Sequence, residues 1–343
     1  MVSRPTVADV AREAGVSVAT VDRVVNGRLP VREDTARRVL EAAQRISFHA
    51  VGLIRSRLRE QLPEVAVGVL LQRPDEPFYA DLTRQLQRAI TGARAFRGVS
   101  RLDYWVKDDP EDIAARLRRL ARRCQAVALV SPDHPAVAAA IADVAGTGLP
   151  VFTMLSDCAP ASRTSYLGID SRKAGRTAAW LIRKCAPRGG KVAVIVGSRR
   201  FQGHELREMG FRSFFREVAP EFVVLDAVVN SESDAATEEA ILQLAERHRD
   251  LVGIYLAGGG AAGGVAALRA IEPGRRPAMI CPSLQPEVRA ALADGVLTAA
   301  ICEPVDRLTE RLVEAVTQAL DEQGPRVPNQ IVLPMDLYTP ENL

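Results

Sequence analysis

The sequence predicts an all-α head followed by an α/β region with two doubly wound parallel sheets. Two short amphipathic helices joined at Gly15 lie near the amino terminus, in a segment where positive charge is also concentrated. From Val65 onward, short apolar runs alternate with amphipathic helices, which is typical of parallel sheets covered on both faces. At 343 residues, 47% of them hydrophobic, the chain is long enough for two or three domains.

The first helix of the head is expected to begin after Thr6. The hydroxyl of Thr6 can accept a hydrogen bond from an orphan backbone N–H, and Asp9 follows three residues later, as in a capping box. Gly15 suits the left-handed position that ends a helix and permits a sharp turn. The apolar face at helical spacing between them consists of Val7, Val10, Ala11 and Ala14.

A second helix is expected to be capped by Ser17 and to have the apolar side Val21, Val24 and Val25. Two short helices joined by a tight glycine-containing turn form the geometry that lays the second helix in the major groove of DNA. A third helix, opened by Glu33 and Asp34, completes the unit. The pattern therefore predicts a helix-turn-helix DNA-binding head.

The distribution of charge agrees with a DNA-binding head. Residues 1–62 contain eleven arginines and seven acids, whereas the rest of the chain has 34 basic and 35 acidic residues. Positive charge is thus confined to the segment with the helix-turn-helix pattern, as phosphate neutralisation requires. A merely solvated basic face would account for the charge but not for the helix pattern.

Cysteine usage and the absence of a targeting segment predict a soluble cytoplasmic protein that does not bind a membrane. The cysteines are odd in number, widely spaced and without a C-x-x-C pair, which disfavours a disulfide framework or a zinc finger. No signal peptide and no long apolar run is present. The five positions are Cys124, Cys158, Cys185, Cys281 and Cys302.

The domain boundaries follow from these changes of pattern. We expect a head over 1–47, a hinge connector over 48–63, and an effector-binding and dimerisation region over 64–343. Its strands are too many for one open sheet. The two expected subdomains cover 64–167 with 304–327, and 168–303 with 328–343. Ligands of such folds bind at the carboxyl ends of the strands, here in a cleft between the subdomains.

The chain resembles the lactose-repressor (LacI/GalR) family of bacterial transcription regulators. The resemblance is carried by TVADVAREAGVSVATVDRVVNG at 6–27 and VREDTARRVLEAA at 31–43. The region 64–343 resembles ribose-type periplasmic binding proteins (type I) in PFY at 77–79, YLGIDSRKAG at 166–175 and REMGF at 207–211. The resemblance implies a homodimer, or a tetramer, whose paired heads read a pseudo-palindromic operator and whose clefts bind a small effector.

The resemblance also places the DNA-reading positions. Val18 and Ala19 sit where base-reading side chains lie, and small apolar groups there can contact a thymine methyl. The position of Asp22 is commonly Ser in the family, and a carboxylate near phosphates is repulsive unless it accepts from a cytosine amino group. The expected DNA-binding residues are Thr6, Ser17, Val18, Ala19, Thr20, Asp22, Arg23, Asn26, Arg57 and Leu58.

The connector departs from the family pattern. Relatives have a Pro-Asn pair after an aromatic residue, then a Leu that wedges into the minor groove, whereas here Phe48 precedes His-Ala-Val. Counting the register puts Arg57 where that Leu is expected, with Leu58 next. An apolar wedge unstacks bases, whereas Arg favours a narrow minor groove. Either Leu58 takes the wedge role in a shifted register, or the operator is bent differently.

By the same resemblance, an effector site is expected from Glu76, Phe78, Tyr79, Asp157, His204, Arg207, Ser283 and Glu303. Aromatic faces suit the C–H side of a sugar ring, and carboxylates accept from hydroxyls. The alternatives are core aromatics at a helix start, a surface helix arginine and a structural histidine. Relatives place Asp at position 283 and often Asn-Asp at the Gly258-Gly259-Gly260 run, so a standard aldopentose is not expected.

The remaining motifs exclude other functions. The glycine-rich segment 257–264 lacks P-loop spacing and more simply provides a close backbone approach or a tight turn. No ligand-spaced metal set and no nucleophile elbow occur, so neither a cofactor nor a metal is expected, and the protein is not expected to be an enzyme.

The sequence therefore predicts an allosteric regulator, most simply a repressor, that binds operator DNA and a sugar, polyol or sugar acid. The acids of the pocket favour a neutral effector over a phosphorylated one. Inducer and corepressor mechanisms use the same linkage with opposite sign. The alternative, based on Asp22 and the altered connector, is a cytoplasmic sugar-binding sensor that lacks DNA-binding activity.

Overall fold

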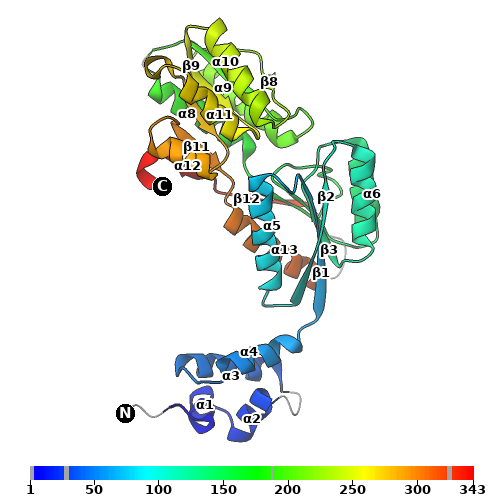
Figure 1. The fold of residues 1–343 in the computed structure, drawn as a ribbon. Coiled ribbons are helices and arrows are strands. Elements are labelled where there is room, and N and C mark those ends of the chain that lie inside the picture. Colours follow the sequence, from blue (N-terminus) through cyan, green and yellow to red (C-terminus); the bar gives the residue numbers. More distant parts are fainter. Residues whose placement is uncertain (1–3, 27–30, 187, 323–326) are drawn as a thin grey trace. The chain divides into compact units, whose positions relative to one another are not determined.

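The computed structural model describes residues 4–26, 31–186, 188–322 and 327–343. The chain divides into two compact units, one made of residues 1–65 with 91–99 and the other of residues 66–90 with 100–343. The first unit contains the head together with residues 91–99, and the second contains most of both sheets, so each is described by itself (Figure 1).

The head contains four helices, α1 (Val7–Ala14), α2 (Val18–Asn26), α3 (Glu33–Arg45) and α4 (Val51–Glu60). The predicted capping box at the start of α1 is present, because the Asp9 N–H donates to Thr6 Oγ1 at 3.3 Å and the Thr6 N–H donates to Asp9 Oδ2 at 2.9 Å. Gly15 ends α1 in the left-handed region with φ 63°. The expected helix-turn-helix geometry is therefore present.

The core of the head joins all four helices. Val10, Val21 and Val39 are fully buried together, and Ile54 of α4 is fully buried in the same cluster. Arg38 of α3 donates to the Ala14 carbonyl at 3.0 Å, which satisfies an orphan carbonyl at the end of α1. The expected boundary between head and connector is thus corrected, because α4 is a fourth helix that packs into the head core.

The first sheet has the strand order β12-β5-β4-β3-β1-β2, and its pairs β1–β3, β3–β4, β4–β5 and β5–β12 are parallel. Helices α5 and α13 lie on one side of it and α6 on the other (Figure 1). The strands are β1 (Glu64–Gln72), β2 (Arg97–Trp105), β3 (Ala126–Leu129), β4 (Val151–Met154), β5 (Ser165–Ile169) and β12 (Asn329–Leu333), and the helices are α5 (Pro77–Thr91), α6 (Pro110–Ala121), α7 (Pro135–Gly146) and α13 (Val305–Asp321).

The second sheet has the order β13-β11-β10-β9-β6-β7, with β8 also paired to β6 and only β13 recorded as antiparallel among the described strands. The strands are β6 (Lys191–Val196), β7 (Val223–Val224), β8 (Val228–Val229), β9 (Leu251–Leu256), β10 (Ala278–Cys281), β11 (Ala299–Cys302) and β13 (Asp336–Tyr338). The helices are α8 (Ser171–Cys185), α9 (Gln202–Val218), α10 (Asp234–Arg247), α11 (Ala261–Ala270) and α12 (Pro286–Ala293), and short 3₁₀ turns cover Pro273–Arg275 and Pro340–Asn342.

The chain passes between the two sheets three times, after β5, after β11 and after β12. The two subdomains around the sheets are called here the first lobe and the second lobe. The assignment of 328–343 to the second lobe is corrected for the strand Asn329–Leu333, which pairs in parallel with Ser165–Ile169 of the first sheet. Only Leu333 of this strand is buried, so its apolar residues do not indicate which sheet it joins.

Replacing Ile54 by Ala is expected to destabilise the head by about 2–5 kcal/mol, because it removes a fully buried side chain from a well-packed core. Hydrogen–deuterium exchange of the amides of α1 to α3 measures the effect as faster exchange. Leu53→Ala is the matched control, since Leu53 is 45% exposed on the same helix. Equal protection in both variants would contradict the assignment of α4 to the head core.

Candidate DNA-binding and effector-binding sites

One face of α2 is turned away from the head core. Val21 and Val24 are buried. Exposed residues recur at spacings of three and four on the opposite side, where they form a continuous face. The exposed face consists of Val18, Ala19, Asp22, Arg23 and Asn26, and all five belong to the residues that the sequence predicts to contact DNA.

Hydrogen bonds fix several polar side chains of this region. Ser17 caps α2 as expected, since the Thr20 N–H donates to Ser17 Oγ at 3.1 Å and the two hydroxyls lie 2.8 Å apart. Asn26 Nδ2 donates to Asp22 Oδ1 at 2.7 Å, so one turn of α2 joins the two side chains. The Asp22 carboxylate therefore already accepts one hydrogen bond within the helix.

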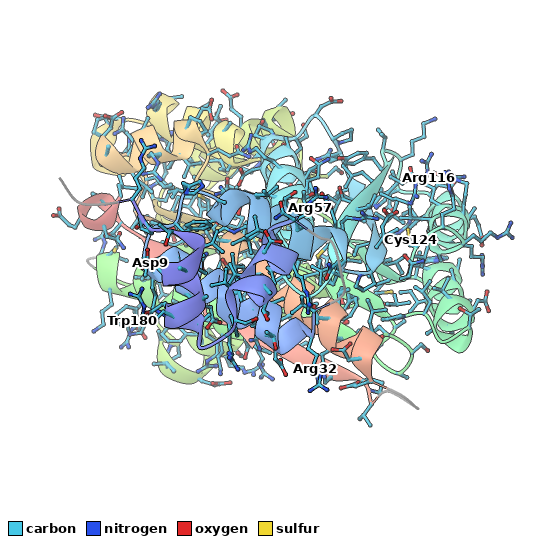
Figure 2. All side chains as sticks on the ribbon, turned by 90° about the horizontal axis from the view of Figure 1, so that it is seen from below. Asp9, Arg32, Arg57, Arg116, Cys124 and Trp180 are labelled. Carbon is cyan, nitrogen blue, oxygen red and sulfur yellow. The ribbon has the colours of Figure 1, made fainter. Side chains whose placement is uncertain are left out.

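On α4, Arg57 and Leu58 have different environments. Arg57 is exposed and forms an ion pair with Glu60 at 3.0 Å; Figure 2 labels it together with Asp9 of α1. Leu58 is partly buried and packs against the head core. A Leu58 wedge would have to leave that packing, whereas Leu53 presents an exposed apolar side chain on the same helix.

A pocket lies within the second unit, at the carboxyl ends of strands from both sheets. Gln72 ends β1, Glu232 follows β8, and Glu303 follows β11. This is the position that parallel α/β sheets provide for ligands. Of the predicted effector-binding residues, the pocket is lined by Glu76, Phe78, Tyr79, His204, Arg207, Ser283 and Glu303.

The position of Arg207 depends on the close crossing of α8 and α9. A Cβ on Gly175 would lie 1.9 Å from the Arg207 carbonyl oxygen, and one on Gly210 would lie 2.1 Å from the Arg172 carbonyl oxygen. Only glycine at both positions lets the backbones approach this closely. Arg207 then donates to Glu303 Oε1 at 2.8 Å and to the Ala257 carbonyl at 3.0 Å, and its side chain is 9% exposed.

The pocket residues that the sequence analysis did not name include Gln72, Arg73 and Glu232. Arg73 donates to the Ser231 carbonyl at 3.2 Å and to the Glu232 carbonyl at 3.1 Å, and its guanidinium lies 3.5 Å from Glu232 Oε2. Gln72 donates to the same carboxylate oxygen at 3.3 Å. Their places at the carboxyl ends of β1 and β8 are the signal that could have identified them, but β8 has only two residues and is hard to recognise in the sequence.

Direct contacts join the two lobes around the pocket. Besides the Arg73 contacts, Gln285 Nε2 of the second lobe donates to Glu76 Oε1 at 2.9 Å, and the Gly203 N–H donates to Ser156 Oγ at 3.1 Å. Arg73, Ser231 and Glu232 all have left-handed backbones, with φ of 47°, 52° and 57°. Such non-glycine conformations cost energy and are concentrated at functional sites.

His204 stands in the pocket as a neutral side chain. Burial, together with the positive charge of Arg207, lowers the pKa of His204 to about 3. Its Nε2 lies 3.7 Å from Glu232 Oε1. Burial also raises the pKa of Glu232, against the opposing effect of Arg73. His204 therefore adds no positive charge to the pocket near neutral pH.

Asp157 does not line the pocket, which corrects the expectation for this residue. Both of its oxygens lie 2.7 Å from Arg163 nitrogens, and Thr153 and the Cys158 N–H donate to Oδ1. Arg163 also donates to the Asn329 carbonyl at 2.6 Å, which ties β12 to the first lobe. Asp157 thus serves the fold, because its carboxylate is occupied by these donors.

Replacing Asp157 by Asn is expected to destabilise the effector unit by about 3 kcal/mol or more, because it leaves the buried Arg163 without its carboxylate. Burial opposes ionisation of Asp157, but the bonds from Arg163 and Thr153 prevail and hold its pKa below the usual value. The ionised Asp157 therefore contributes its full share to the stability of the fold above the unfolded pKa of about 3.9. This contribution is lost as the pH falls through the lower, folded pKa.

Thermal unfolding followed by circular dichroism measures this difference. Asp143→Asn is the control, because Asp143 forms an exposed pair with Arg118, and such pairs contribute only about 0–1 kcal/mol. Similar losses in both variants would contradict the structural role of Asp157.

Comparisons with known proteins agree with this geometry. Residues 6–50 match the lacI family of bacterial regulatory proteins, and residues 67–324, most of the chain, match the periplasmic binding protein domain. The chain belongs to the periplasmic binding protein domain family and carries a LacI-family helix-turn-helix head. The LacI family is one of regulators and not of enzymes.

Two curated regulators are similar to part of the chain. Catabolite control protein A from Priestia megaterium is 38% identical over 86 residues, which are 25% of this chain and 25% of that protein. The HTH-type transcriptional regulator RegA from Clostridium saccharobutylicum is 40% identical over 79 residues, 23% of each chain. The matches thus span about a quarter of the length of these relatives.

Solved structures share the fold of the second unit. A solute binding protein of an ABC transporter from Burkholderia graminis, in complex with D-arabinose, has a TM-score of 0.72 at 20% identity and covers 82% of this chain and 97% of its own. Another from Agrobacterium vitis, with bound D-fucose, has a TM-score of 0.71 at 18% identity and covers 81% and 96%. This likeness shows the fold that the sequence predicted, two lobes of the periplasmic binding protein type.

Two negative observations apply to the described part of the chain. None of its helices has the length and apolar character needed to cross a membrane. Over the same residues, no group of three or more His, Cys, Asp or Glu side chains is placed to hold a metal ion.

Proposed function

We propose that this protein is a cytoplasmic homodimeric transcription regulator, a repressor, whose affinity for operator DNA is set by a small hydroxyl-rich effector. The DNA-binding part of the proposal is supported by the exposed face of α2. The apolar and the polar side chains of this face all lie on the side of the helix away from the head core. A capped helix of this kind fits the major groove, where a helix reads base edges.

The pocket between the lobes supports the effector part of the proposal. It combines aromatic side chains with carboxylates and amides, which suits hydroxyl groups on an apolar ring. Relatives of the same fold hold D-arabinose and D-fucose, which favours a compound of that chemical class.

Effector and operator would act on one equilibrium between lobe orientations. An effector that binds one orientation more tightly shifts the population, and this changes the spacing of the paired heads. Linkage requires that each ligand alters the affinity for the other by the same factor, typically through about 1–3 kcal/mol of coupling.

The experiment that tests this function is a gel-shift or anisotropy titration of full-length protein with the promoter of its own operon. We expect specific binding, and a shift of affinity by about 5- to 150-fold when the effector is added. Failure to distinguish the promoter from random duplex of equal length would favour the alternative, a sugar sensor without DNA-binding activity.

Replacing Arg23 by Ala is expected to weaken operator binding and to lower the slope of log affinity against log salt by about 1, because one phosphate contact is lost. Arg269→Ala removes the same charge from an exposed position on α11 and is expected to leave both quantities unchanged. An unchanged salt slope in the Arg23 variant would remove this residue from the DNA-binding face.

Replacing Arg207 by Leu is expected to abolish the effector response while the free protein still binds the operator, since Arg207 lies in the pocket and not in the head. Thermal shift supplies a second measure. An effector at 100 times its Kd should stabilise the native protein by about 2.7 kcal/mol, and the variant should show no such gain. A full response in the variant would contradict the assignment of this pocket.

A further inference from the structure

The pocket is lined by more acidic side chains than arginines. They are two arginines, Arg73 and Arg207, and three carboxylates, Glu76, Glu232 and Glu303. Arg207 pairs with Glu303 at 2.8 Å, and Arg73 lies 3.5 Å from Glu232. The imidazole of His204 is neutral. Glu76 is therefore the one carboxylate of the described lining that no arginine pairs with.

Glu76 has no ion-pair partner among the residues that the structure describes. Its Oε1 accepts from Gln285 at 2.9 Å, and no donor to Oε2 is recorded in the described chain. Phe78 and Tyr79 follow it after Pro77 and line the same pocket. Carboxylates beside aromatic faces are the surroundings that bind an ammonium group, through charge-assisted hydrogen bonds and the negative face of the rings.

A second observation concerns the opposite wall. Arg207 is 7% exposed, and its Nε is buried without a hydrogen-bond partner in the described structure. Its two terminal nitrogens already donate to Ala257 and Glu303. A buried N–H without a partner destabilises the structure, so a ligand that brings an oxygen acceptor to this nitrogen gains affinity. Because Glu303 already neutralises the guanidinium, a hydroxyl oxygen suffices there.

We propose that the effector is a hydroxyl-rich compound that carries one protonated amine, such as an amino sugar or an amino polyol. Its ammonium group is bound by Glu76, with Glu232 close to it, and a hydroxyl accepts from Arg207 Nε. The inference rests on the proposed function, since it names the effector class of the same pocket.

The charged side chains of the pocket disfavour two other classes of effector. A phosphate ester would bring further negative charge to a lining in which acids already outnumber arginines. A free amino acid would place its carboxylate near Glu303, and like charges at close range repel. An amine on a neutral polyhydroxy compound avoids both conflicts.

The test compares matched compounds by calorimetric titration of the full-length protein. D-glucosamine, D-galactosamine and D-mannosamine are each compared with the parent hexose and with the N-acetyl derivative, at about pH 6.5, below the pKa of about 8 of an α-amino group. We expect at least one amine to bind about tenfold more tightly than its parent, and the N-acetyl form to lose this advantage because it has no charge.

Two variants assign the preference to Glu76. Glu76→Gln keeps the shape and the acceptor for Gln285 but removes the charge, and it should weaken amine binding about tenfold while neutral sugars change little. Asp75→Asn is the matched control, since Asp75 is its exposed neighbour and does not line the pocket. It should leave every affinity unchanged.

Three outcomes would overturn the inference: no amine binds more tightly than its parent, Glu76→Gln weakens amines and neutral sugars equally, or Asp75→Asn has the same effect as Glu76→Gln. The operator titration separates this from the proposed function. If a neutral sugar alters operator affinity, the inference of an amine-bearing effector is wrong, but the proposed function as a transcription regulator still holds. If the protein binds no operator, the proposed function itself is contradicted.

Discussion

The buried ion pair between Arg207 and Glu303 is the contact on which the effector pocket depends. Arg207 comes from α9 of the second lobe, and Glu303 lies where the chain passes from β11 back to the first lobe. Glu303 Oε2 also accepts from the Ile169 N–H at 3.3 Å, beside another of the three passages between the lobes. One carboxylate thus links the ligand wall to two hinge segments. Under the proposed function, a ligand that engages Arg207 would act on the segments that join the two lobes.

The residues of that contact were predictable, because each lies in a recognisable local pattern. The sequence REMGF identified Arg207, and Glu303 directly follows a short apolar strand. The head was predictable for the same reason, since the capping residue Thr6 and the turn glycine Gly15 act within a few residues of the chain. Their physical effects are local, so the sequence alone reveals them.

The remaining parts depend on contacts between distant segments. Glu232 lies in the pocket only because β8 pairs with β6, and Arg73 meets it across 159 residues of chain. Asp157 follows a strand end just as pocket residues do, yet Arg163 six residues later captures its carboxylate. The strand Asn329–Leu333 and the burial of Ile54 were likewise missed. Sheet order and helix packing depend on contacts between distant segments, so no short stretch of sequence reveals them.

The contacts of Arg73 have a geometric consequence for the cleft. Its guanidinium is held by the carbonyl oxygens of Ser231 and Glu232, and all three residues are fixed in left-handed turns. This one side chain therefore spans the gap between the lobes at this rim. The length of an arginine, together with the hinges behind it, then sets the smallest width that the cleft can take there.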